Sequence, residues 1–167
     1  MANEETHLFQ LNPCPGLESL GQLSKLVIII HGFNSNADDW ADDMAREILR
    51  EDPTNKLGVL TVDWSEGATG GITLTRYNPP AANTRYVGVA TERILKQLGK
   101  ADLEVHCIGH SLGAHTCSFL ANAVKADTGF SKQDVDRITG MDPAGPQFLT
   151  DGRRKSIHIM QNIFLFF

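Results

Sequence analysis

Four apolar segments recur along the chain and are separated by stretches with helical periodicity. The segments "KLVIIIHGF" (25–33), "KLGVLTVDW" (56–64), "DLEVHCIGH" (102–110) and "VDRITGMD" (135–142) are short and rich in β-branched residues. Continuous apolar runs of this length are typical of strands that are buried on both faces of a sheet. The pattern therefore predicts four strands in the interior of one sheet.

Helical spacing appears between these predicted strands. Trp40, Met44 and Ile48 recur every four residues within 38–52, which is the period of one helical face. Asn34, Ser35 and Asn36 precede this segment and offer capping side chains. A second helix is predicted by its apolar face, with Asn83 as its N-cap; the face consists of Val87, Ala90, Ile94, Leu95 and Leu98. A third is predicted over 112–125, and the Gly-, Pro- and Asn-rich segment 65–83 is predicted to be a loop.

Alternating strands and helices predict a mostly parallel sheet with helices on both faces, an open α/β fold. In such sheets, ligands bind beyond the carboxyl ends of the strands. His31, Asp63, Ser111 and Asp142 all fall at predicted carboxyl ends. This shared placement predicts a functional site at that edge.

The segment Gly109-His110-Ser111-Leu112-Gly113 fits the G-x-S-x-G turn that places a nucleophilic serine between a strand and a helix. Glycines flank the serine because strand and helix approach each other too closely for a Cβ atom. The first amides of the following helix, including that of Leu112, are then directed toward an oxyanion. We therefore expect Ser111 to be a nucleophile.

Other strand ends offer the remaining parts of a hydrolytic site. The Phe33 amide in "HGF" is expected to be the second oxyanion donor, and His31 is expected to organise that loop. Asp142 follows Ser111 in the order Ser…Asp…His of this fold, and we expect it to be the acid. Asp63 is the rival acid, but it precedes the serine and lies beside Trp64, which indicates packing.

Composition limits the alternatives. The chain has 167 residues, 41% hydrophobic and 21% charged, which is typical of one globular domain. A net charge of −5 without a basic stripe argues against nucleic-acid binding, and no apolar run is long enough to span a bilayer. The first residues show no signal-peptide pattern. The three cysteines have no metal-ligand spacing, and Cys107 and Cys117 are interpreted as buried free thiols.

The ordered motifs "IIIHGF", "VDW", "ANTRYVGV", "GHSLGAH" and "GMDPAGP" resemble those of the animal pancreatic-lipase family, which includes triacylglycerol lipases, lipoprotein-type lipases and phospholipases A1. The resemblance runs from about residue 26 to residue 148. It implies an α/β-hydrolase fold, hydrolysis of lipid esters at a lipid–water interface, and secretion. It also implies Ser111 as nucleophile, Asp142 as acid, and Phe33 and Leu112 as oxyanion donors. We expect no cofactor and no bound metal.

The chain departs from the family pattern after Phe148. We expect an N-terminal lead-in (1–24), a partial α/β-hydrolase domain (25–148) and a divergent tail (149–167), with the C-terminal strands of the family missing. In the family the catalytic histidine follows further strands and a lid. Only His158 follows Asp142 here, and the interval is too short for those elements, so we expect this chain to lack the family's histidine.

Two other functions remain open at this stage. The first is a non-catalytic member of the fold that binds lipid or protein, as the yolk-protein relatives do, and an absent histidine favours it. The second is an intracellular esterase or thioesterase, which the lack of a signal peptide favours. The intact "GHSLG" motif argues against the first, and "ANTRYVGV" has no reason to occur in the second.

Overall fold

A computed structural model describes the backbone of residues 10–13, 23–54, 56–70, 74–98, 102–127, 134–145, 148–150, 153–154 and 163–166. The strands are β1 (Gln10–Pro13), β2 (Lys25–Ile30), β3 (Leu57–Asp63), β4 (Glu104–His110), β5 (Arg137–Met141), β6 (Leu149–Thr150), β7 (Arg153–Arg154) and β8 (Ile163–Phe166). The helices are η2 (Ala37–Asp39), α1 (Ala41–Arg50), α2 (Ser65–Ala68), α3 (Leu74–Leu98) and α4 (Leu112–Ala126).

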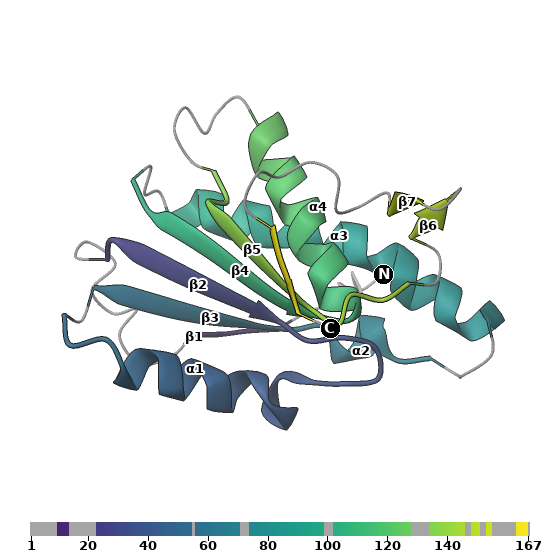
Figure 1. Ribbon diagram of the computed structural model, residues 1–167, viewed down its shortest axis with the longest axis horizontal. Helices are drawn as coiled ribbons and strands as arrows, with labels where there is room; N and C mark the ends of the chain where they lie inside the picture. Colours follow the sequence, from purple (N-terminus) through teal and green to yellow (C-terminus); the bar gives the residue numbers. More distant parts are fainter. Residues whose placement is uncertain are drawn as a thin grey trace, which may run out of the picture.

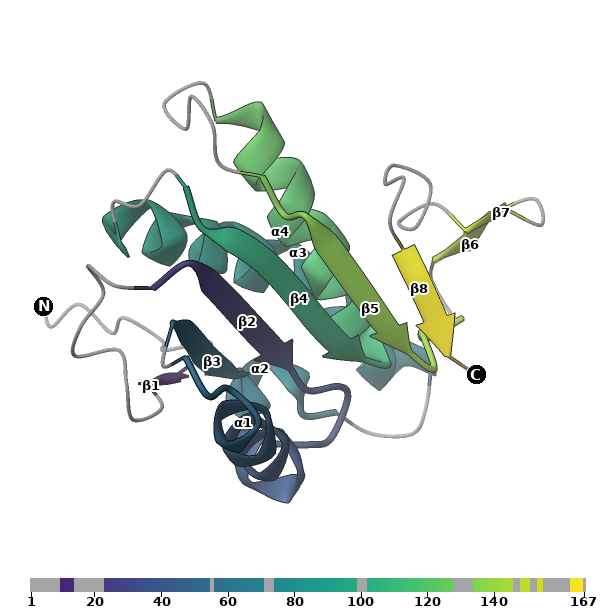
Figure 2. The ribbon, with the colours of Figure 1, turned by 60° about the vertical axis from the view of Figure 1, so that its left-hand side comes forward.

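One central sheet organises these elements, with strand order β1-β3-β2-β4-β5-β8. All neighbouring strands in it are parallel except β1, which runs antiparallel to β3. Helix α1 covers one face, and α3 and α4 cover the other (Figures 1 and 2). The fold predicted from the sequence, a mostly parallel sheet between helices, is confirmed.

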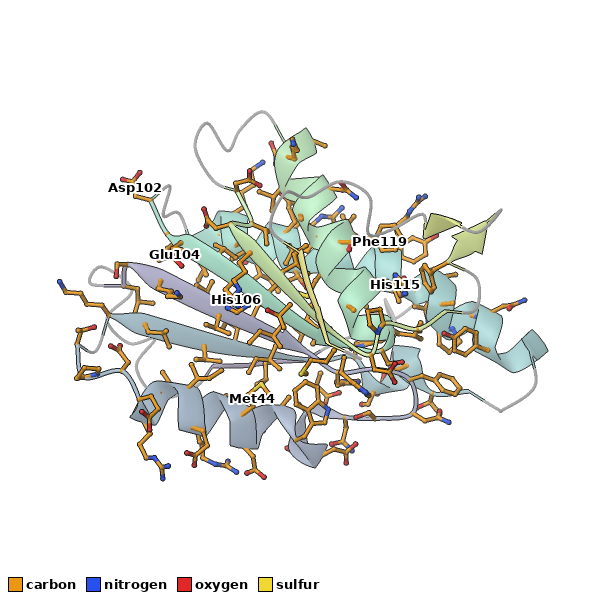
Figure 3. All side chains as sticks on the ribbon, in the orientation of Figure 1. Met44, Asp102, Glu104, His106, His115 and Phe119 are labelled. Atoms are coloured by element: carbon orange, nitrogen blue, oxygen red, sulfur yellow. A yellow bond between two sulfur atoms is a disulfide. The ribbon has the colours of Figure 1, made fainter. Side chains whose placement is uncertain are left out.

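Alternating side chains of the central strands feed two separate apolar cores. Leu26, Ile28 and Ile30 of β2 point into the larger core with α3 and α4. Val27 and Ile29 point into the smaller core, where Met44 of α1 packs against the sheet (Figure 3). Because both faces of β2 are buried, its sequence shows a continuous apolar run rather than an alternation of apolar and polar residues.

The predicted loop over 65–83 is wrong in part, because α2 occupies its start and α3 begins at Leu74. Pro79 and Pro80 lie inside α3, where each lacks the N–H of a helical hydrogen bond. Close packing on α4 favours the helix: a Cβ at Gly88 would come within 2.8 Å of the Leu120 nitrogen. Asn83 consequently lies inside α3 and does not cap it; its side chain donates to the Gly67 carbonyl.

The predicted caps of the first helix are partly confirmed. The Asn36 side chain accepts from the Asp39 amide, and the Asp39 carboxylate accepts from the Asn36 amide. This reciprocal pair caps the short helix η2, and Trp40 separates η2 from α1. The helix predicted over 38–52 is therefore split in two.

The C-terminal tail extends the central sheet. Strand β8 pairs in parallel with β5, with Ile138 opposite Ile163 and Met141 opposite Phe166. The segment "IFLF" thus occupies the edge beyond β5, and Figure 2 shows β8 beside that strand. The divergent tail therefore supplies a strand that the sequence interpretation did not predict.

Burial of His106 predicts a loss of stability in acid. Desolvation of the half-buried His106 ring lowers its pKa from 6.5 to about 4, and the positive charges of Arg137 and Lys25 add to this shift. The His106 Nε2 lies 2.8 Å from the Thr139 hydroxyl. Between these pH values the unfolded chain binds a proton that the folded chain does not bind, so folding stability falls as the pH falls. Urea unfolding at several pH values should show His106→Gln losing about 1–2 kcal/mol less than wild type between pH 6.5 and 4, a figure reduced for partial exposure. Parallel pH profiles of the two proteins would contradict the assignment.

Candidate active site

Ser111 lies at the sharp turn between β4 and α4, where the sequence placed it. Its backbone adopts φ 52° and ψ −115°, a region that non-glycine residues rarely occupy. The Ser111 amide donates to the Met141 carbonyl at 2.9 Å, and the Ser111 carbonyl accepts from the Ala144 amide at 3.3 Å. The end of β5 and the loop after it thus hold both the amide and the carbonyl of Ser111.

Two glycines make this turn possible, as the motif predicted. A Cβ at Gly109 would lie 2.3 Å from the Gly113 carbonyl carbon, and a Cβ at Gly113 would lie 2.1 Å from the Ile30 oxygen. Both clashes involve backbone atoms, which have little room to move. Strand β4, helix α4 and strand β2 therefore meet at distances that only glycine permits.

A third glycine brings the loop after β2 to the serine. A Cβ at Gly32 would lie 2.8 Å from the Ser111 Cβ and 2.9 Å from the His110 carbonyl oxygen. Gly32 precedes Phe33, so the peptide of the predicted oxyanion donor lies next to the predicted nucleophile. Within the described residues, neither the Phe33 amide nor the Leu112 amide has a hydrogen-bond acceptor.

His31 organises this loop from a fully buried position. Its Nε2 accepts the Trp64 amide at 3.0 Å, and its Nδ1 lies 3.0 Å from the Gly32 carbonyl. Desolvation lowers the pKa of His31, although the Gly32 carbonyl and Asp63 oppose that shift. The ring is therefore neutral at pH 7, with its proton assigned to Nδ1 because Nε2 accepts.

Asp63, the rival acid, belongs to the same cluster. Its Oδ1 lies 3.2 Å from His31 Nε2 and accepts the Ser65 amide at 2.9 Å. Burial would raise the pKa of Asp63, but the hydrogen bonds from Ser65 hold it below its usual value. Since His31 Nε2 accepts the Trp64 amide, its contact with Asp63 is not an ion pair at pH 7.

Asp142 lies at the end of β5, directly after the Met141 that binds the serine amide. Its backbone has φ 42°, and its side chain is exposed. The loop that follows is fixed to α4: His115 donates from Nε2 to the Ala144 carbonyl at 2.6 Å, and its ring stacks on Phe148 at 3.6 Å (Figure 3). His115 therefore packs the loop that carries Asp142.

The other histidines of the described chain also have partners away from the serine. His110 packs edge-on against Trp40, with ring centroids 6.0 Å apart, and His106 contacts Thr139 on β5. His7 and His158 lie outside the described residues. The described chain thus brings Ser111, Gly32, Phe33 and Leu112 together without supplying a histidine to the serine hydroxyl.

One feature near the serine contradicts the sequence interpretation. Cys107 and Cys117 are not free thiols but form a disulfide between β4 and α4, with Cα atoms 5.7 Å apart. The turn at Ser111 folds α4 back over β4, so residues on either side of it come within bonding reach. The G-x-S-x-G motif, combined with this spacing, was a signal that could have predicted the bond.

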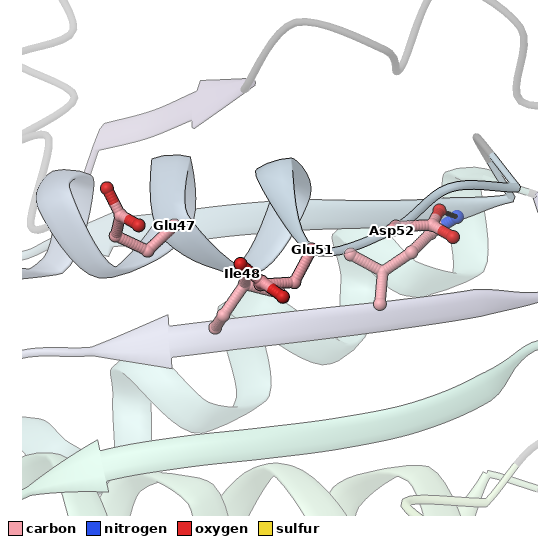
Figure 4. Close-up of a pocket in the computed structure, with 5 residues that line it drawn as sticks. Glu47, Ile48, Glu51 and Asp52 are labelled. Carbon is pink, nitrogen blue, oxygen red and sulfur yellow. Dashed lines mark hydrogen bonds between the residues drawn. The ribbon is translucent and has the colours of Figure 1, made fainter.

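A separate pocket lies far from this site. It has a volume of about 460 Å³ and is lined by Glu47, Ile48, Glu51, Asp52 and Leu57 (Figure 4). Leu57 begins β3, so the pocket lies at the amino ends of the parallel strands, opposite Ser111. The Asp52 carboxylate already accepts hydrogen bonds from the amides of Thr54, Lys56 and Leu57. The pocket is therefore not part of the candidate active site.

The described residues contain neither a candidate metal site nor a helix that could span a membrane. No group of His, Cys, Asp or Glu side chains there is arranged to hold a metal ion. None of the helices in those ranges combines the length and the apolar character that crossing a bilayer requires.

Solved structures show the same fold. A phospholipase/carboxylesterase from Dyadobacter fermentans superposes with a TM-score of 0.50 at 11% identity, over 94% of this chain and 86% of that one. A thermophilic esterase from Thermogutta terrifontis gives a TM-score of 0.50 at 13% identity, over 81% of this chain and 48% of that one. The fold is that of the α/β-hydrolases.

Sequence comparison then gives the family. The lipase family model matches residues 19–158. Human pancreatic lipase-related protein 2 is 36% identical over 129 residues, which cover 74% of this chain and 24% of that protein. A phospholipase A1 from Vespa basalis is 36% identical over 132 residues, covering 74% and 42% respectively. The chain belongs to the pancreatic-lipase family, and it spans between about a quarter and two fifths of the length of these relatives.

The disulfide predicts a measurable contribution to stability. Replacing Cys107 and Cys117 together by alanine should lower the free energy of unfolding by about 2–3 kcal/mol, chiefly because the unfolded chain loses a short covalent loop. Chemical denaturation of both proteins under non-reducing conditions measures the difference. Mass spectrometry after alkylation should find the two cysteines in one linked peptide, and alkylation of both residues without reduction would contradict the bond.

Proposed function

We propose that this chain carries the nucleophile, the acid and the oxyanion site of a lipid ester hydrolase. The observation that carries the proposal is the strained turn at Ser111, φ 52°, with Gly32 of the loop after β2 against its Cβ. Strain of this kind costs about 1–3 kcal/mol and persists where the surrounding packing enforces it. Its position beside two amides without acceptors in the described chain supports a catalytic purpose.

In the proposed mechanism Ser111 Oγ attacks the ester carbonyl carbon while its proton passes to a general base. The carbonyl oxygen becomes an oxyanion, which the Phe33 and Leu112 amides stabilise by donating hydrogen bonds. The carbon–oxygen bond to the alcohol then breaks, the base returns its proton to the leaving alkoxide, and an acyl-enzyme remains. A water molecule then attacks the acyl-enzyme with the help of the same base and oxyanion donors, and the carboxylic acid product leaves. Asp142 orients the base in both halves of the reaction. The described residues supply no base, so the proposal assigns that role to none of them.

The substrate class rests on the family rather than on the site. Similar proteins are named as pancreatic lipase-related proteins and as phospholipases A1. Both names refer to hydrolysis of a carboxylic ester in a lipid, and we propose that class as the substrate, met at a lipid–water interface. The proposal leaves open whether a triacylglycerol or a phospholipid is preferred.

An extracellular location is part of the same proposal. The resemblance to the family implies secretion, and the Cys107–Cys117 disulfide supports it, because such bonds persist mainly in oxidising compartments. An intracellular esterase would keep these thiols reduced in most organisms.

A fluorophosphonate probe tests the serine. The Ser111 oxygen should bond to phosphorus with loss of fluoride, so wild type is labelled and Ser111→Ala is not. Ser24→Ala, which changes an exposed serine far from the turn, serves as the matched control and should label like wild type. Equal labelling of wild type and Ser111→Ala would refute the reactive serine, and no labelling of either would favour the non-catalytic member of the fold.

A second experiment tests the acid. Asp142→Asn keeps the shape of the side chain but removes the charge that orients a base and stabilises it when protonated. The rate of p-nitrophenyl butyrate hydrolysis should fall between about a hundredfold and ten-thousandfold. Asp102→Asn, at an exposed position just before the amino end of β4 and so at the opposite end of the sheet, should leave the rate unchanged. A rate for Asp142→Asn within threefold of wild type would remove Asp142 from the mechanism.

A further inference from the structure

The loop after β2 is tied to the segment after β3 by side chains at both of its ends. At the start, the Trp64 amide donates to His31 Nε2 and the Trp64 indole donates to the His31 carbonyl at 2.9 Å. At the end, the Asn34 amide donates to the Ala68 carbonyl at 3.1 Å, and the Gly70 amide donates to Asn34 Oδ1 at 2.9 Å. Gly32 and Phe33 therefore lie between two anchored residues.

Asn34 is suited to this position by its backbone as well as by its side chain. Its φ of 49° lies in the left-handed region, which asparagine tolerates better than most non-glycine residues. That conformation turns the chain directly after Phe33, toward residues 68–70. The Asn34 amide already donates to the Ala68 carbonyl, so it is not a third oxyanion donor.

The anchor itself is braced from a helix on the large core. Asn83 of α3 donates from Nδ2 to the Gly67 carbonyl at 2.9 Å. The amides of Gly67 and Ala68 both donate to the Trp64 carbonyl at 2.8 Å, so the turn that holds Asn34 is closed on itself. A path of hydrogen bonds thus runs from α3 through residues 67–68 to Asn34.

The side chain of Phe33 is fixed on the same side. Its ring packs edge-on against Tyr77 of α3, with centroids 5.2 Å apart and an interplanar angle of 66°. The Phe33 ring therefore contacts α3, while the peptide between Gly32 and Phe33 carries the amide that has no acceptor in the described chain. That peptide lies between His31 and Asn34, so the hydrogen bonds that fix these two residues and the packing of the Phe33 ring limit its rotation.

We propose that Asn34, braced by Asn83, is a positioning residue that holds the Phe33 amide in the direction needed to bind the oxyanion. The inference rests on the proposed function, because it assigns a role within that oxyanion site. Asn34 touches no reacting atom and acts by fixing the backbone that follows Phe33. A preorganised donor costs no rearrangement when the charge develops, whereas a donor that must rotate into place loses part of its benefit.

The maximal rate of fluorophosphonate labelling separates this role from a structural one. Asn34→Gly keeps the left-handed backbone but removes the acceptor of the Gly70 amide. It should lower the maximal labelling rate of Ser111 about tenfold, a fraction of the effect of deleting an oxyanion donor, while the probe concentration for half-maximal rate stays within about twofold. Asn34→Asp keeps the acceptor oxygen and should remain within about threefold of wild type.

Matched variants distinguish the possible failures. Ser35→Ala, next along the chain, loses only contacts to Asn36 and Asp39 and should label like wild type. Asn83→Ala removes the brace within a helix that alanine favours, and it should lower the rate about threefold without a change in melting temperature. If Asn34→Gly fails to fold, Asn83→Ala decides. If Asn34→Gly and Asn83→Ala fold and are labelled at the wild-type rate, the positioning role is overturned but the proposed function is not. If Ser111 is not labelled in the wild-type protein, both the proposed function and this inference are overturned.

Discussion

The close approach of three backbone segments around Ser111 is the constraint on which the site depends. Strand β4, helix α4 and the end of β2 are separated by distances that leave no space for a Cβ at Gly109 or Gly113. Because the sheet fixes β2 and β4 side by side, the helix can only leave β4 through a turn that strains the serine backbone. The geometry of the proposed nucleophile is thus set by the packing of the fold rather than by its own hydrogen bonds.

Two polar clusters fix the loops at the carboxyl ends of the strands, on either side of Ser111. On one side, neutral His31 links the loop after β2 to Trp64 and Asp63 in a buried environment. On the other, His115 fixes the loop after β5 to α4. Both histidines therefore stabilise loops that flank the serine, and their burial explains why neither is available to take its proton.

The central sheet and the turn were predictable because their signals are local. Buried parallel strands produce continuous apolar runs, and the turn requires glycines at fixed offsets from Ser111. The features that sequence reasoning missed depend on contacts between distant segments. Pro79 and Pro80 locally favour a loop, yet packing of α3 on α4 outweighs that preference. The amide of Asn34 finds its acceptor beyond β3, and no pattern within either segment indicates that partner.

The Cys107–Cys117 bond also bears on the order in which the molecule can be assembled. The two cysteines are separated by 10 positions, and the segment between them contains the whole turn, Ser111 included. Closing so short a loop costs little chain entropy, so the disulfide can form as soon as β4 and the start of α4 pack together. Oxidation would then hold the strained turn at Ser111 in place before the strands at the edges of the sheet have paired.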